Sequence, residues 1–250
     1  MTSERLIPQS ADALRSPTVD RSGKRKWIYP DRRSGRYSRQ RGIIALFLIL
    51  FYLTAPFIKI QGLPLIRFDI SSGIVYGLGQ TFRFADGYYF VFVLLSLAML
   101  LAWATSLWGR IWCGYGCPQT VFVEWLIRPI EEWIEGSAAK RRKNDGLPIT
   151  LELAGKKVVK DTLFTIVIFM ISNVLLAYFV DPKVLLRWIH SSPSEEPIAF
   201  SVMSFVFALL FFDLVWFREQ FCAFLCPYAR FQSVLISVAT PTVAYDSIRG

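Results

Sequence analysis

Four long apolar runs alternate with polar segments along this chain. They cover about residues 42–58, 88–107, 162–180 and 199–217. A helix needs roughly 20 apolar residues to cross a bilayer, with a range of about 17 to 25. A segment inside the hydrocarbon must also satisfy its own backbone hydrogen bonds, which an α-helix does. The pattern therefore predicts an all-α integral membrane protein with four transmembrane helices.

The polar segments predict how the rest of the chain is organised. Residues 1–41 combine many Lys and Arg with few apolar residues, and they lack the apolar core and cleavage pattern of a signal peptide. We therefore expect a disordered basic arm over residues 1–41, followed by a membrane domain over 42–250. The basic side chains of the arm would contact anionic membrane lipid.

Shorter patterns occupy the connections between the runs. Apolar positions recur at helical spacing from Val121 to Ile134, with glutamates between them. This favours an amphipathic helix at the membrane interface, which Pro129 should kink or break. Residues 228–240 repeat the pattern more weakly. The loop 59–87 places glycines among apolar and β-branched residues, which fits either a short hairpin or a re-entrant turn.

Composition and charge agree with a membrane protein and predict its orientation. Of the 250 residues 54% are apolar, the mean hydropathy is +0.40 and the net charge is +9. With a cytoplasmic N-terminus, the three inner segments hold 11, 9 and 3 Lys and Arg, whereas the two outer segments hold 3 and 2. This excess follows the positive-inside rule and places both termini in the cytoplasm. No base-reading motif accompanies the charge, so we do not expect a nucleic-acid partner.

All four cysteines lie in two copies of one motif. Each copy is Cys-x3-Cys-Pro and follows an apolar run and an arginine. The copies comprise Arg110, Cys113, Cys117 and Pro118, and then Arg218, Cys222, Cys226 and Pro227. The order of span, outer loop, span, arginine, motif and interfacial helix occurs twice, so we predict a two-fold pseudo-repeat. Both motifs would then lie at the cytoplasmic ends of the second and fourth spans.

The spacing of the cysteines points to a metal or cluster site. Side chains at positions i and i+4 share one face of a helical turn, so both sulfurs of a pair would reach one centre. A proline is favoured at the first position of a helix. Cys117 and Cys226 should therefore lie at helix N-termini, where the helix dipole stabilises a thiolate. Gly114 and Gly116 would let the backbone approach a bulky centre closely.

The number of thiols leaves the metal open. Four thiolates suit an iron–sulfur cluster or a structural zinc, whereas a pair suits Cu(I). A reducing cytoplasm favours metal thiolates over disulfides.

Other polar residues near the spans are weaker candidates. Asp213 lies inside the fourth run, where a carboxylate needs a partner, and Arg218 would be that partner. Arg110 and Arg218 either extend toward the interface or offset thiolate charge. Asn173 should hydrogen-bond to a neighbouring helix. His190 is the only histidine and is not expected to be a ligand.

Both motifs resemble a known family. The stretch from Trp112 to Phe122, followed by Glu124 and Trp125, resembles the first motif of the CcoG/FixG/RdxA proteins. The stretch from Phe221 to Gln232 resembles their second motif. The closing residues Tyr245, Asp246, Arg249 and Gly250 match the stretch that leads into the rest of that family. A more distant similarity extends to membrane ferredoxin-like proteins of the NapH and NosR type.

The resemblance implies a function and a set of partners. Family members assist assembly of the cbb(3)-type cytochrome c oxidase in the bacterial inner membrane, and they are linked to reduction of Cu(II) to Cu(I) through 4Fe-4S clusters. The chain would then belong to a cupric reductase or another electron-transfer oxidoreductase. Its partners would be membrane lipid, oxidase assembly factors or a copper transporter, and an unidentified electron donor.

The resemblance also implies which residues carry over. The family's ferredoxin domain follows the position that matches Gly250, and this sequence has no C-x2-C-x2-C-x3-C-P run. We therefore expect the chain to be the N-terminal membrane portion. Only Cys113, Cys117, Cys222 and Cys226 carry over as cofactor- or metal-binding residues, with no catalytic residue. A module that binds Cu(I) directly and a scaffold that docks the oxidase or a copper transporter are the alternatives.

Overall fold

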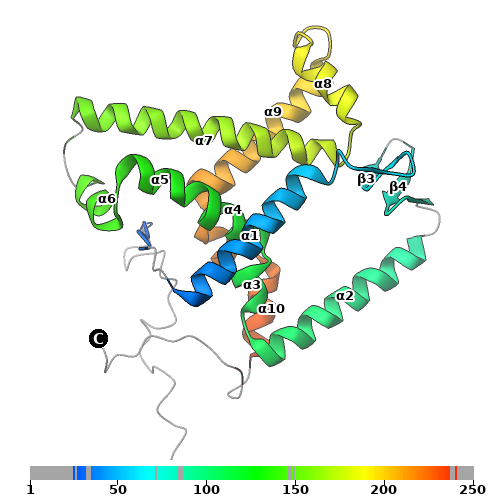
Figure 1. The fold of residues 1–250 in the computed structure, drawn as a ribbon, viewed down its shortest axis with the longest axis horizontal. Coiled ribbons are helices and arrows are strands. Elements are labelled where there is room, and N and C mark those ends of the chain that lie inside the picture. Colours follow the sequence, from blue (N-terminus) through cyan, green and yellow to red (C-terminus); the bar gives the residue numbers. More distant parts are fainter. Residues whose placement is uncertain are drawn as a thin grey trace, which may run out of the picture.

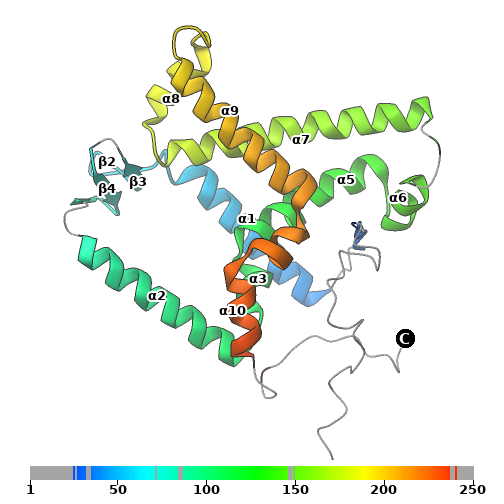
Figure 2. The same cartoon turned by 180° about the vertical axis from the view of Figure 1, so that it is seen from behind.

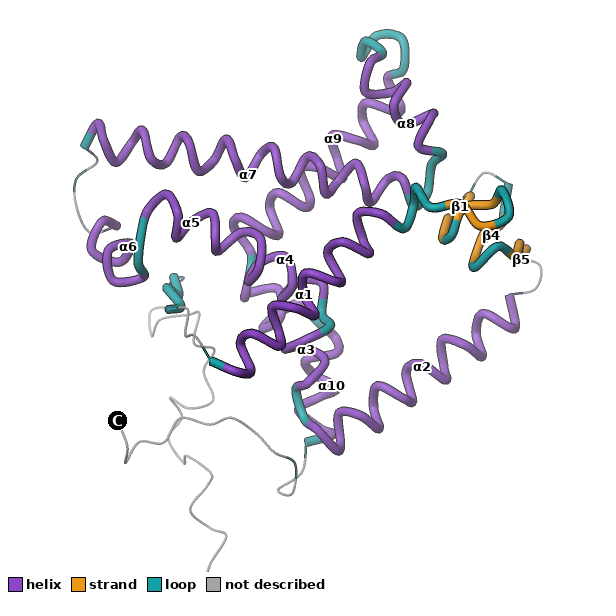
Figure 3. Tube along the Cα trace, viewed as in Figure 1, coloured by secondary structure: helices purple, strands orange, loops and turns teal. Residues whose placement is uncertain are grey.

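The computed structural model is built mainly from helices, and it describes residues 25, 27–31, 35–70, 72–83, 87–145, 148, 150–236 and 240 (Figures 1 and 3). Within these ranges three helices are long and apolar enough to cross a membrane. They are α2 (Gly87–Trp108), α7 (Leu151–Ala177), and α9 (Pro197–Phe211) with its π-helical continuation η5 (Phe212–Phe217). The first and last of them match the second and fourth apolar runs to within two residues, whereas α7 begins 11 residues before the third run, which was predicted at residues 162–180.

The first apolar run forms α1 (Arg36–Thr54), which is not among the three candidate spans of the described chain. Three arginines lie in its first two turns. It stops short of the expected end at residue 58 because Pro56 has no N–H to donate to the carbonyl of Tyr52. The hydroxyl of Tyr178 donates to that carbonyl instead, at 2.9 Å. Four transmembrane helices in a two-fold pseudo-repeat are therefore not confirmed.

The start of α1 also moves the expected edge of the basic arm. Residues 36–41 belong to the helix, so the predicted boundary at residue 41 falls inside α1. Residues 27–31 pack beside α5, α6 and α7 (see below), while residues 1–24 lie outside the described part of the chain.

The loop after α1 folds into two small sheets, so the all-α prediction is wrong here. Strands β1 (Lys59–Ile60) and β2 (Leu63–Pro64) form one antiparallel pair. Strands β3 (Ile66–Asp69), β4 (Ile74–Gly77) and β5 (Gln80–Arg83) form an antiparallel sheet in that order. Two of the turns contain two residues each, and both residues have positive φ: 53° and 85° at Gln61-Gly62, and 51° and 79° at Leu78-Gly79. Such turns match the strand twist of a hairpin, so the hairpin alternative holds.

The larger sheet docks on the C-terminal end of α7. The backbone N–H of Phe68 donates to the carbonyl of Tyr178 at 2.7 Å. The guanidinium of Arg67 pairs with Asp181 at 2.6 Å. Asp181 also caps α8 (Pro182–His190) by accepting from the backbone N–H of Lys183. The sheet is thus held where one span ends and the next helix begins.

The packed centre of the molecule lies where α7 crosses the fourth span. Phe164, Ile168 and Ile171 of α7 are buried against Leu214 of η5 and the π-helical segment η4 (Val123–Ile127). By contrast, only 6% of α2 is buried, and this helix stands apart from the others in both views (Figures 1 and 2). Its exposed apolar surface suits lipid rather than protein contact.

Each cysteine motif begins in one short helix and ends at the start of another. After α2 come α3 (Ile111–Tyr115), α4 (Pro118–Phe122), η4, α5 (Arg128–Glu135) and α6 (Ala138–Asp145); after η5 come η6 (Phe221–Leu225) and α10 (Pro227–Leu235). The expected interruption near Pro129 is real but mild. This proline lies in the first turn of α5, and the preceding π-turn bonds the N–H of Arg128 to Val123, five residues back.

Candidate metal centre

The two cysteine motifs end with the same backbone geometry. Cys117 has φ −69° and ψ 122°, and Cys226 has φ −67° and ψ 111°. The following prolines occupy the first turns of α4 and α10, so the predicted position of both cysteines at helix N-termini is confirmed. The N–H of each bonds to a carbonyl five residues back, Trp112 at 3.0 Å and Phe221 at 2.9 Å. Each motif is therefore one wide turn that opens a new helix.

The motifs differ before that point. Cys113 lies in the α-helical turn α3, whereas Cys222 lies in the π-helical turn η6. A π-turn spaces side chains differently from an α-turn. The expectation that each pair shares a helical face at i and i+4 thus describes neither pair fully, since Cys117 and Cys226 have extended backbones.

The four thiols lie within electrostatic reach of one another. Burial raises the pKa of the Cys113 thiol, and the nearby thiols of Cys117 and Cys226 raise it further. Burial likewise raises the pKa of Cys222 to about 11, with contributions from Cys117, Cys226 and Cys113 in that order. Like charges raise the pKa of a thiol only when they are near. The fold therefore gathers cysteines from both motifs around one region.

Across the described ranges, no group of three or more Cys, His, Asp or Glu side chains is arranged to hold one metal ion. The number and type of the thiols match the ligand set of a 4Fe-4S cluster. In a 4Fe-4S cluster four cysteines hold four irons, so the sulfurs surround the cluster rather than meet at its centre.

Two glutamines and a hydroxyl pair connect the motifs across more than 90 residues of sequence. Gln232 of α10 accepts from the Cys113 thiol at 3.6 Å and donates to the carbonyl of Gly109 at 3.3 Å. Thr105 of α2 contacts the hydroxyl of Tyr228 at 2.5 Å. Gln232 and Thr105 are each 1% exposed. These buried bonds fix the end of α2 against the helix that follows the second motif.

Gln119 makes the second connection. Its amide donates to the carboxylate of Asp213 at 3.2 Å and to the carbonyl of Arg218 at 3.3 Å. The expected pairing of Asp213 with the Arg218 side chain is therefore wrong. Gln119, Arg218 and Cys222 line a cavity of about 120 Å3, and Asp213 is not among its lining residues.

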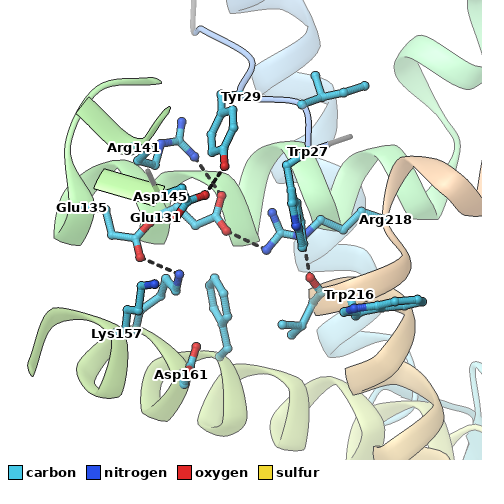
Figure 4. A pocket seen from close by; sticks show the side chains of 14 residues that line it. Trp27, Tyr29, Glu131, Glu135, Arg141, Asp145, Lys157, Asp161, Trp216 and Arg218 are labelled. Atoms are coloured by element: carbon cyan, nitrogen blue, oxygen red, sulfur yellow. Dashed lines mark hydrogen bonds and ion pairs between the residues drawn. The ribbon is translucent and has the colours of Figure 1, made fainter. Parts of the chain in front are cut away.

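Arg218 instead forms a buried ion triad. Its guanidinium pairs with Glu131 of α5 at 2.6 Å, and the same carboxylate pairs with Arg141 of α6 at 2.9 Å (Figure 4). Arg218 is 8% exposed and has φ 47°, a left-handed conformation that is unusual for a residue with a side chain. It is thus neither an interfacial arginine nor a thiolate partner, but a link between the two halves of the chain.

The structure also places the remaining residues that the sequence suggested. Arg110 lowers the pKa of Cys113, so it lies close enough to offset thiolate charge. Asn173 donates to Phe169 of its own helix, and its buried carbonyl oxygen has no hydrogen-bond partner in the described chain, so the predicted inter-helix bond is not formed. His190 contacts the Leu186 carbonyl of its own helix.

The glycines of the first motif have separate roles. A side chain at Gly116 would meet the ring of Trp112 at 3.0 Å, so this glycine serves packing within the motif. A side chain at Gly114 would enter open space, and the carbonyl of Gly114 accepts from Arg41 at 2.9 Å. Of the two, only Gly114 leaves room beside the cysteines.

Gln119, Gln232 and Glu131 were missed as site residues in the sequence. Gln119 follows the Cys-Pro of the first motif directly, and Gln232 lies six residues after Cys226. The signal available in the sequence was a glutamine close to each pair of cysteines. The charge of Glu131 gave none, because glutamates alternate throughout that segment.

Comparison with known proteins supports this view of the motifs. Residues 90–143 match the model of a 4Fe-4S binding domain, and residues 217–250 match that of a 4Fe-4S dicluster domain. Each match contains one of the two cysteine pairs.

Three relatives align with most of the chain. The nitrogen fixation protein FixG of Rhizobium meliloti is 29% identical over 96% of this chain and 46% of its own length. Protein RdxB of Cereibacter sphaeroides is 31% identical over 91% and 48%, and protein RdxA of the same organism is 29% identical over 89% and 48%. The chain belongs to the CcoG/FixG/RdxA family. It spans about half the length of the curated relatives in this family that it matches, and no solved structure matches it.

Proposed function

We propose that this chain is the membrane module of an iron–sulfur electron-transfer protein, and that Cys113, Cys117, Cys222 and Cys226 together hold one 4Fe-4S cluster. The observation that carries the proposal is that thiols from both motifs lie within electrostatic reach of one another. Four cysteines are the full ligand set of such a cluster. The two 4Fe-4S domain matches, each of which contains one pair, add independent support.

The surroundings fit a cluster that carries one electron at a time. Such a group would supply a reversible electron carrier at the membrane surface, with a potential set by charge, hydrogen bonds and burial. Arg110 offsets the negative charge of the thiolates, and the amide of Gln232 is within reach of the Cys113 sulfur. The distribution of Lys and Arg along the sequence supports a cytoplasmic position in the inner membrane.

Iron content tests the shared cluster. Protein purified without oxygen should contain about four irons and four sulfides per chain. If one cluster spans both motifs, Cys113→Ser alone and Cys222→Ser alone should each remove nearly all the iron. Two separate sites would leave about half in each single variant, and that result would contradict the proposal. His190→Ala, which changes the only histidine, should keep the full iron content.

We further propose that the electron reduces Cu(II) to Cu(I) during assembly of a cbb(3)-type cytochrome c oxidase, with assembly factors or a copper transporter as partners. Membership of the family supports this step, and the electron would come from a separate donor protein or molecule. Membranes that contain the protein should reduce added Cu(II), as measured with a Cu(I)-specific chelator. A rate that Cys113→Ser leaves unchanged would sink the copper role while leaving the cluster intact as a proposal.

A further inference from the structure

A cavity of about 300 Å3 lies beside the ion triad of Arg218, Glu131 and Arg141. Helices α5, α6 and α7 and the end of η5 form its walls, and Trp27 and Tyr29 of the segment 27–31 close one side (Figure 4). None of the four cysteines lines it. A ligand in this cavity would therefore be distinct from the proposed cluster, and the inference below does not depend on it.

Most charges in the lining are already paired inside the protein. The pairs are Glu131 with Arg141 and Arg218, Glu135 with Lys160, and Asp145 with the hydroxyl of Tyr29. Two side chains are left over. Lys157 and Asp161 make no side-chain hydrogen bond or ion pair within the described ranges, although both line the cavity and stand one turn apart on α7. Lys157 is half-buried and Asp161 is exposed, so both charges are available to a ligand that carries both signs.

Arg141 supplies a third unmet group. Its side chain is 5% exposed, and its buried Nε has no hydrogen-bond partner. Buried donors nearly always have an acceptor in folded proteins. A phosphate group offers several acceptor oxygens and negative charge, so it would satisfy both Arg141 Nε and Lys157. The ammonium of the same ligand would then face Asp161.

The position of the cavity indicates a lipid source for that ligand. Its floor is Phe164, close to where the apolar part of α7 begins, and its wall reaches Trp216 at the end of the fourth span. Tryptophans mark the headgroup level of a membrane. Trp216 is 49% exposed and lies 5.0 Å from Phe212, itself 52% exposed, between ring centroids. This apolar surface continues from the rim of the cavity along the outside of the span, where acyl chains would lie.

We propose that this cavity binds the headgroup of a zwitterionic phospholipid, with the phosphate against Lys157 and Arg141 and the ammonium against Asp161. Phosphatidylethanolamine has this chemistry. The headgroup of phosphatidylglycerol would satisfy the two cations but leave Asp161 facing an uncharged glycerol.

Binding of short-chain lipids to the purified full chain in detergent tests the proposal. Dihexanoyl-phosphatidylethanolamine should bind about tenfold tighter than dihexanoyl-phosphatidylglycerol, because only the former pairs with Asp161. Asp161→Asn should make the two affinities equal. Lys157→Gln should weaken both lipids by about tenfold, since both carry the phosphate. Retained lipid counted by native mass spectrometry gives a second measurement.

Matched controls lie on the same helix. Glu152 and Lys156 pair with each other outside the cavity, so Glu152→Gln and Lys156→Gln should leave both affinities unchanged. Equal binding of the two lipids to the unaltered protein would overturn the proposal. So would Asp161→Asn and Lys157→Gln variants with the same lipid affinities as the unaltered protein. Free phosphoethanolamine that binds as tightly as the lipid would show a soluble ligand instead and overturn the lipid source.

Discussion

At the scale of single residues, Arg218 and Glu131 connect the parts of the chain that carry the two motifs. Arg218 follows the fourth span directly and holds a left-handed backbone, which costs on the order of 1 kcal/mol. Its ion pair with Glu131 and its bond to the carbonyl of Val215 at 2.8 Å keep it there. Because Glu131 also pairs with Arg141, a single carboxylate forms ion pairs with two buried guanidinium groups.

Replacing that carboxylate should destabilise the protein strongly. Glu131→Gln keeps the size of the side chain but leaves two buried cations without a counter-charge, which should cost about 3 kcal/mol. Thermal unfolding in detergent would measure the loss. Glu152→Gln alters an exposed pair on α7 and serves as the control, with no measurable change expected. Equal unfolding temperatures for the two variants would show that the triad does not support the fold.

A glycine in α1 makes an equally specific contact. A side chain at Gly42 would meet the ring of Trp125 at 2.8 Å, so Gly42→Ala should push α1 away from η4 and cost about 1–3 kcal/mol. At Gly155, inside α7, an added methyl meets nothing within 4 Å. Gly155→Ala should therefore stabilise the helix by about 0.5–1 kcal/mol. Opposite shifts in unfolding temperature are the expected result, and a neutral Gly42→Ala would contradict the close packing.

At the scale of elements, the three candidate spans could be predicted from the sequence, whereas the hairpins were one of two alternatives and the end of α1 was not predicted. Long apolar runs specify spanning helices locally, so α2 and the fourth span agree closely with the predicted ranges, while α7 extends 11 residues further toward its N-terminus than predicted. The hairpins depend on positive φ at Gln61 and Leu78, residues that seldom signal such turns. The helix α1 ends where Pro56 frees a carbonyl that only the distant Tyr178 reaches.

The attachment of the outer sheet should depend on pH through Asp181. The N–H of Lys183 holds the pKa of Asp181 below its usual value, and Arg67 adds to the effect against desolvation. A lowered native pKa means that the stabilisation is complete above the unfolded value of about 3.9 and is lost as the pH falls through the native value. The amide of Phe68 bonds to Tyr178, and its protection factor in hydrogen exchange should therefore fall below about pH 4.

Two substitutions separate the charge of Asp181 from its role as a helix cap. Asp181→Asn keeps a capping side chain but removes the charge, so the protection factor of the Phe68 amide should no longer vary with pH in the acid range. Asp181→Ala removes both and should cost a further amount of about 1 kcal/mol in α8. Unchanged pH dependence in Asp181→Asn would assign the effect to another group.

At the scale of the whole molecule, the two halves of the chain meet at the cysteines. Apart from the contacts of its C-terminal end, α2 packs little against the other helices. Both sets of thiols could be located in the sequence because all cysteines fall in one repeated motif. The contacts that bring them together could not, since Gln119 with Asp213 and Gln232 with Gly109 join residues remote in sequence. Amides carry no spacing pattern, so only the fold reveals these partners.

A double-mutant cycle tests the junction between α2 and α10. Thr105→Val and Tyr228→Phe each remove one hydroxyl of the buried contact with little change of shape. Each should destabilise the protein, and the coupling between them should be about 0.5–1.5 kcal/mol. Additive effects would mean that the two hydroxyls do not interact and that α2 is held at its inner end by other contacts.

The contact between Gln232 and Cys113 has a consequence for biosynthesis. A ribosome completes and inserts α2 and the first motif long before it has made residue 232. During that interval the first pair of thiols has no counterpart, and the amide partner of Cys113 does not yet exist. The site can therefore be completed only after α10 has been synthesised. A nascent chain stalled before α10 would leave one cysteine pair open to other metal ions and to oxidants.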